Sequence, residues 1–268
     1  AAGLAVLFFY SVYLRAREYR FARTNLKLMD GEQKRVAQRA VAKFWRNLWV
    51  TIFWCVIIFI VIPLLVYYFS YYWQLTPDGT FNIRGVWEMQ KSMYAYHSGL
   101  TSDTHFFRSP WYQWPLIIKP MWYYSGADFM PAGWVSSISC MGNPAVWWGG
   151  LAALFFVIAR LFFGKSFGDR RYLFVVIGFL SQYLPWTLVY RSTFIYHYFA
   201  SVPFIILAIA LFFEWLRRTK HGVYIRLVWI YGAAALALFI MFYPIMSGMP
   251  CLRAYANLLR WFKSWYIF

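Results

Sequence analysis

The chain has few charged residues and very few acidic ones. Only 13% of its 268 residues are charged and 62% are hydrophobic, whereas soluble domains carry roughly 25% charged residues. The apolar residues form long unbroken runs, and a run of about 18 or more predicts a membrane-spanning helix. These features exclude a water-soluble fold and predict a polytopic integral membrane protein.

Cysteines and metal-binding spacings are also scarce. Cys55, Cys140 and Cys251 form no CxxC or Cys/His spacing that would suggest zinc. Cys140 and Cys251 fall on one predicted face, where they can pair if that face is oxidising or stay unpaired. His97 and His105 lack a third strong ligand nearby, whereas catalytic zinc usually needs three. We therefore expect no metal site.

Recognisable catalytic motifs are absent. The sequence holds no G-x-S-x-G, H-E-x-x-H or Walker motif. The acidic residues of its longest loop are scattered and form no acid–base pair: Asp78, Glu88, Asp103 and Asp128. We therefore assign no catalytic residue to this chain.

Apolar segments make up most of what is present. The expected fold class is an all-α integral membrane protein with about six transmembrane helices, at 1–14, 48–70, 145–163, 172–190, 198–216 and 227–247. Each of the last five has the length of the hydrocarbon core at 1.5 Å per residue. Residues 1–14 are too short to span and are followed by arginines, not by a cleavage site. We interpret them as the end of a truncated helix.

The basic residues predict the orientation. Residues 15–47 carry ten Lys/Arg against three acids, and the loops 164–171 and 217–226 are also basic. Such loops are expected to be cytoplasmic, so the net charge of +17 indicates membrane lipid and not nucleic acid as the partner. Within 15–47, apolar residues at helical spacing predict an amphipathic helix over 30–48, either on the leaflet or as a solvated linker. The loop 71–144 and the tail 248–268 should then be extracytoplasmic, with 145–247 as a four-helix membrane region.

The large loop 71–144 is rich in aromatic residues and proline. Loops this long are usually functional or disordered, and this composition is not that of a disordered segment. The aromatics can form a belt at the membrane interface. Alternatively, His97, His105 and Arg108 lie near a site for an anionic or sugar ligand.

A shorter loop indicates a functional site more specifically than the large loop does. Residues 191–199 read RSTFIYHYF and place Arg191, Tyr196, His197 and Tyr198 at the mouth of two predicted spans. Ionisable residues at a membrane segment are costly and often functional, and arginine suits phosphate binding. The alternative is that Arg191 and His197 only extend to the interface.

Three sequence blocks together resemble the C-terminal region of the protein O-mannosyltransferases. The first holds Ser109, Trp111, Trp114 and Pro115, the second is the stretch from Gly142 to Trp148, and the third runs from Arg191 to Tyr198. They occur in order, each at the predicted extracytoplasmic face, and the resemblance covers residues 50–250.

The resemblance implies a GT-C fold and a reaction. Mannose would pass from a polyprenyl phosphate to Ser or Thr of an exported protein, with the lipid-linked sugar as substrate and no cofactor. The family's catalytic Asp–Glu pair lies in an N-terminal half that this sequence does not contain. Such a reaction also needs a cation for the departing phosphate.

From the matching positions we expect a substrate site at the extracytoplasmic face, formed by Arg191, Tyr196, His197, Asn143, Trp111, Trp114, His105 and Arg108. Arg191, Tyr196 and His197 would form the wall of the lipid-phosphate or acceptor site. Trp111, Trp114 and Asn143 would shape the cavity, or else serve only in packing.

Other functions remain open at this point. One alternative is a GT-C enzyme with another sugar or acceptor, and another is a non-catalytic subunit or transporter. The absence of internal repeats and of midplane charges disfavours transport. The resemblance favours a bacterial-type member in the plasma membrane, whereas a eukaryotic member would lie in the ER. Dimerisation or association with the secretion machinery is a further expectation.

Overall fold

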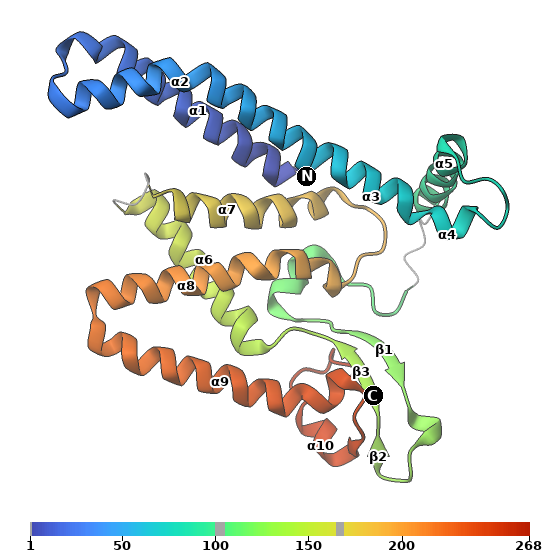
Figure 1. Ribbon diagram of the computed structural model, residues 1–268. Helices are drawn as coiled ribbons and strands as arrows, with labels where there is room; N and C mark the ends of the chain where they lie inside the picture. Colours follow the sequence, from blue (N-terminus) through green and yellow to red (C-terminus); the bar gives the residue numbers. More distant parts are fainter. Residues whose placement is uncertain (1, 100–104, 165–168) are drawn as a thin grey trace. The chain divides into compact units, whose positions relative to one another are not determined.

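A computed structural model of the chain describes residues 2–99, 105–164 and 169–268. It is mostly helical (Figure 1) and divides into two compact units at residue 100.

The first unit opens with a helical hairpin. Its arms are α1 (Ala2–Asn25) and α2 (Gly31–Val56), joined through a 3₁₀ turn at Leu26–Leu28. The Tyr19 ring stacks on the Phe44 ring with centroids 4.4 Å apart. Tyr19 lies late in α1 and Phe44 in the middle of α2, and the earlier Arg15 of α1 contacts the later Thr51 of α2, so the two arms are antiparallel (Figure 1).

Helix α2 does not stop where the apolar sequence begins. It continues through a π-helical turn (Ile57–Val61), α3 (Ile62–Ser70) and α4 (Tyr72–Leu75), and together these form a 45-residue candidate membrane span. Pro63 lies in the first turn of α3, and a proline ring displaces the carbonyl four residues earlier, which explains the wider turn. The amphipathic segment and the following span, predicted as separate elements, are therefore one helix. Helix α5 (Ile83–Gly99) completes this unit.

The second unit packs its helices closely at glycines. Its helices are α6 (Pro144–Phe163), α7 (Arg170–Tyr183), α8 (Val202–Thr219), α9 (His221–Ser247) and α10 (Arg253–Leu258). A Cβ on Gly150 of α6 would lie 2.8 Å from Ile205 of α8, and one on Gly178 of α7 would lie 2.1 Å from the Phe204 ring. Both helices approach α8 so closely only because these positions lack a side chain.

The all-α prediction is wrong for the segments that were predicted to be extracytoplasmic. Among the described residues, β1 (Met121–Ser125) pairs antiparallel with β3 (Ser137–Cys140), and β2 (Trp134–Val135) pairs with β4 (Cys251–Leu252). The predicted loop also contains 3₁₀ turns at Trp111–Leu116 and Ala127–Phe129. The β2–β4 pairing joins residues more than a hundred positions apart, which leaves no local sequence pattern, whereas the β1–β3 pairing joins residues fewer than twenty positions apart within the loop.

The prediction of six spans is supported in part. In the part of the chain that the structure describes, four helices are long and apolar enough to cross a membrane: Gly31–Leu75, Pro144–Phe163, Ile195–Thr219 and His221–Ser247. The predicted span 172–190 is not among them. There, α7 ends at Tyr183 and the chain continues as a 3₁₀ turn (Leu184–Leu188), because Pro185 restricts the residue before it.

The C-terminal segment is built into the core. Trp265 and Ile117 are fully buried, and Trp265 Nε1 donates to the Ile117 carbonyl oxygen at 2.6 Å. Ile117 has a φ of 54°, an unfavourable conformation for a β-branched residue. The bond from Trp265 therefore helps to hold the turn that follows Trp114.

Candidate functional site

The second sequence block forms the start of α6. Asn143 caps the helix, because its Oδ1 accepts from the backbone N–H groups of Ala145 at 3.0 Å and Val146 at 3.4 Å. Pro144 occupies the first turn, where its missing N–H costs nothing. A Cβ on Gly142 would lie 2.0 Å from the Trp147 indole. This block therefore fixes where α6 begins and how Trp147 packs.

The first and third blocks are joined by reciprocal hydrogen bonds across 84 positions. The Ser109 N–H donates to the Thr193 carbonyl oxygen at 2.9 Å, and Thr193 Oγ1 donates to the Ser109 carbonyl oxygen at 2.9 Å. Trp114 Nε1 donates to both the carbonyl oxygen and Oγ of Ser109, each at 3.0 Å. Ser109 and Trp114 are fully buried, so these bonds lock the two segments together.

Side chains from the two joined segments gather around Phe194. This Phe194 cluster consists of His105, Trp114, Phe194, Tyr196 and His197. The Phe194 ring centroid lies 4.8 Å from that of His105, 5.5 Å from that of Tyr196 and 6.3 Å from that of His197. The Trp114 ring stacks on His197 with centroids 5.8 Å apart. The structure thus brings together four of the eight predicted site residues.

Backbone contacts set the orientation of the His197 ring. His197 Nδ1 lies 3.1 Å from the Phe194 backbone nitrogen and 2.9 Å from its carbonyl oxygen. Trp186 covers the same ring, with centroids 4.2 Å apart. Half-buried imidazole and indole rings held this way present fixed surfaces, which suits binding and orienting a ligand.

Two residues that pack against the cluster were not predicted from the sequence. Trp186 comes from the 3₁₀ turn after α7. Tyr123 stacks near Tyr196 with centroids 6.3 Å apart, and it lies where the β1–β3 register shifts, between Trp122 and Tyr124. Such a bulge redirects a side chain. The sequence signal that pointed to Tyr123 was its place in the aromatic-rich loop 71–144.

The other four predicted residues lie around this cluster in different ways. Arg191 is half-buried, precedes Thr193, and lies near enough for its charge to act on Tyr196 and His197. The Arg108 N–H donates to the His105 carbonyl oxygen at 2.9 Å.

Trp111 and Asn143 have packing contacts. The Trp111 ring lies 5.7 Å from the Tyr183 ring, and its carbonyl oxygen accepts from Tyr183 Oη at 3.0 Å. Besides capping α6, Asn143 donates through Nδ2 to the Ala235 carbonyl oxygen of α9 at 2.8 Å. Both sets of contacts match the packing alternative, and the cavity role of these residues stays a prediction.

Cys140 and Cys251 carry free thiols and are buried. Burial raises the pKa of both thiols, so both are protonated at neutral pH. Within the described residues, no group of three or more His, Cys, Asp or Glu side chains converges on a point where a metal ion could bind.

An apolar groove runs beside the start of α8. It has a volume of about 600 Å³ and is lined by Gly142, Trp147, Phe199, Val202, Pro203, Ile206 and Leu207. Trp147 links it to the third sequence block, because its ring lies 4.9 Å from the buried Tyr198 ring.

Comparison with known proteins identifies this architecture. The family described as the C-terminal four TMM region of protein-O-mannosyltransferase matches residues 82–265. A polyprenol-phosphate-mannose–protein mannosyltransferase of Mycolicibacterium smegmatis is 27% identical over 206 residues, which cover 70% of this chain and 38% of that protein. A Mycobacterium tuberculosis protein of the same name is 26% identical over 207 residues, with the same shares covered. The chain therefore spans well under half the length of these relatives.

A solved structure shares the fold. It is that of the Saccharomyces cerevisiae protein O-mannosyltransferase Pmt1–Pmt2 complex bound to the sugar donor, with a TM-score of 0.57 and 24% identity over 69% of this chain and 27% of that one. Since the family match covers more than half of the sequence, the chain belongs to the protein O-mannosyltransferases, and residues 82–265 correspond to their C-terminal four-transmembrane region.

Proposed function

We propose that this chain is the C-terminal membrane portion of an enzyme that transfers mannose from a polyprenyl phosphate to Ser or Thr of exported proteins. The observation that carries the proposal is the pair of bonds between Ser109 and Thr193. They hold Arg191 beside the Phe194 cluster at one end of the helices. The similar bacterial proteins are named as polyprenol-phosphate-mannose–protein mannosyltransferases.

Arg191 is proposed to bind the phosphate of the donor lipid. A guanidinium can donate two parallel hydrogen bonds to phosphate oxygens and stabilise the negative charge of the departing lipid phosphate. The rings of Tyr196 and His197 would form a wall against the sugar or the acceptor. The acidic group that accepts the hydroxyl proton is expected outside this chain.

The apolar groove beside α8 offers a place for the polyprenyl chain. Its lining is largely hydrocarbon and aromatic, and it opens on the candidate span Ile195–Thr219. A lipid chain placed there would enter from the bilayer next to the third sequence block. The phosphate would then be near Arg191, which lies a few residues before this span.

The active face is proposed to be extracytoplasmic, in a bacterial plasma membrane. The matched range contains α6, α7, α8 and α9, and we infer that α7 with its 3₁₀ extension is the fourth transmembrane segment of the family region. Because the similar yeast structure is a complex of two named chains, a dimer or another membrane partner, including the secretion machinery, is part of the proposal.

The test is mannosyl transfer by the full-length protein in membranes. Arg191→Ala should lower transfer at least tenfold, since it removes a charged hydrogen-bond donor from the phosphate. Arg226→Ala is the matched control, because Arg226 is an exposed arginine on α9 in a predicted cytoplasmic loop, and it should leave transfer unchanged. Normal transfer by a well-expressed Arg191→Ala protein would refute this role.

A GT-C glycosyltransferase that uses another sugar or acceptor is the second candidate. It shares the membrane architecture and the need for a phosphate-binding cation. A panel of polyprenyl-phosphate sugars in the same assay separates the two candidates.

A further inference from the structure

The α1–α2 hairpin changes polarity at the same level on both arms. Arg15 of α1 donates through Nη1 to Thr51 Oγ1 of α2 at 3.0 Å. On one side of this contact both arms are apolar, over residues 2–14 and 52–75. On the other side, residues 15–25 of α1 extend roughly 15 Å at 1.5 Å per residue before the turn. The contact therefore marks a boundary between hydrocarbon and headgroups.

The polar end of the hairpin is strongly basic. Residues 15–47 contain ten Lys/Arg and three acids. Trp45 and Trp49 are 58% and 63% exposed close to the boundary, where indole rings favour the headgroup region. A basic surface adjacent to a membrane interface attracts anionic lipids.

One hollow on this surface has arginines and no acidic residue. It has a volume of about 400 Å³ and is lined by Tyr13, Arg17, Arg20, Phe21, Thr24 and Asn25, all from α1. Arg17 and Arg20 are three positions apart and therefore lie on one face of the helix. Tyr13 is 55% exposed at the end nearer the apolar half, where a lipid tail would leave the hollow.

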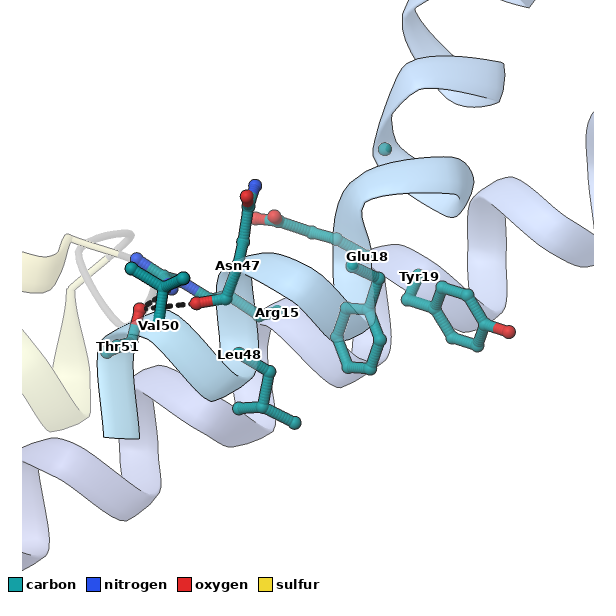
Figure 2. A pocket seen from close by; sticks show the side chains of 9 residues that line it. Arg15, Glu18, Tyr19, Asn47, Leu48, Val50 and Thr51 are labelled. Carbon is teal, nitrogen blue, oxygen red and sulfur yellow. Dashed lines mark hydrogen bonds between the residues drawn. The ribbon is translucent and has the colours of Figure 1, made fainter. Parts of the chain in front are cut away.

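A second hollow, between the two arms, is less suited to an anion. It is lined by residues from both helices, including Arg15, Glu18, Asn47 and Thr51. Figure 2 shows the Arg15 side chain directed to Thr51, to which it is hydrogen-bonded. The Glu18 carboxylate on its wall would repel a phosphate.

We propose that the hollow along α1 is a binding site for an anionic glycerophospholipid. Arg17 and Arg20 bind the phosphate, and the acyl chains follow the apolar half of the hairpin. Two guanidiniums present several N–H donors to one phosphate group. The occupant is a membrane lipid and not a soluble phosphate, because the hollow reaches the boundary where the helix becomes apolar. This site shares no residue with the Phe194 cluster and does not depend on the proposed transferase activity.

The experiment measures lipid selectivity by electron spin resonance. The full chain is reconstituted in phosphatidylcholine membranes that contain spin-labelled phosphatidylglycerol or spin-labelled phosphatidylcholine. The double variant Arg17→Gln/Arg20→Gln is compared with Arg35→Gln/Arg39→Gln, which removes the same charge from exposed positions of α2. Glutamine is a good helix former, and circular dichroism checks that both variants keep the wild-type helix content.

The expected result is that Arg17→Gln/Arg20→Gln lowers the preference for phosphatidylglycerol about tenfold, while the α2 variant keeps most of it. An equal loss in both variants would mean that the basic surface attracts lipid without a defined site, and it would overturn the proposal. An unchanged preference in Arg17→Gln/Arg20→Gln would also overturn it.

Discussion

Trp114→Phe is the most informative change in the bonded segments. Phenylalanine keeps an aromatic ring against His197 and Trp186. It removes the Nε1–H group that donates to the carbonyl oxygen and Oγ of Ser109. The Ser109 carbonyl oxygen still accepts from Thr193 Oγ1. Ser109 Oγ loses its partner at a position that is fully buried.

The expected cost is the sum of two terms. An unpaired buried hydroxyl costs about 1–3 kcal/mol, and the smaller ring leaves a void that adds about 1–2 kcal/mol. The free energy of unfolding of the variant should therefore be about 2–5 kcal/mol lower than that of the wild type. For a domain of 150–250 residues this corresponds to a loss of roughly 4–20 °C in melting temperature.

The assay is thermal unfolding in detergent, followed by circular dichroism. Trp111→Phe is the control, because Trp111 is only half-buried, and it should lose less than Trp114→Phe. Adding Ser109→Ala to Trp114→Phe removes the unpaired hydroxyl and should recover about 1 kcal/mol or more. A Trp114→Phe protein that melts with the wild type, or a double variant without recovery, would refute the account of these bonds.

Two further changes test packing and capping. Gly178→Ala improves helix propensity but places a Cβ 2.1 Å from the Phe204 ring. Overpacking should outweigh the gain in propensity and lower the free energy of unfolding by about 1–3 kcal/mol. Equal or higher stability of this variant in detergent would contradict the close packing. Asp169 caps α7 through the Arg171 N–H at 3.0 Å, so Asp169→Ala should cost about 1 kcal/mol and Asp169→Asn less. The Arg171 guanidinium holds the pKa of the Asp169 carboxyl below its usual range. This ion pair therefore stabilises the fold at neutral pH, and the stabilisation is lost as pH falls through the lowered pKa. The free energy of unfolding should be higher for the wild type than for Asp169→Asn at pH 7, and this difference should disappear below pH 3.

The sequence predicted what depends on local pattern and composition. Long apolar runs identified the membrane class, and four predicted spans, 48–70, 145–163, 198–216 and 227–247, lie within helices that are candidate spans in the structure. The start of α6 in the second sequence block can also be predicted from the local sequence, because Asn143 and Pro144 are typical residues of a helix start.

Features that depend on distant contacts could not be predicted. The pairing of Cys251 with Val135 and the burial of Trp265 against Ile117 have no local periodicity. The arrangement of the site could not be predicted for the same reason. The sequence shows that His105 and Phe194 are present, but the hydrogen bonds between Ser109 and Thr193 are needed to show that the segments of these two residues are in contact.

The measurement that tests the central claim most directly is the donor preference of the full-length protein in membranes. Radiolabelled polyprenyl-phosphate mannose and polyprenyl-phosphate glucose would be offered separately with an exported Ser/Thr-rich acceptor. The proposed function predicts label on Ser or Thr of the acceptor from the mannose donor and little or none from the glucose donor. Efficient transfer of glucose without mannose, or no transfer of either sugar by a well-expressed protein, would contradict it.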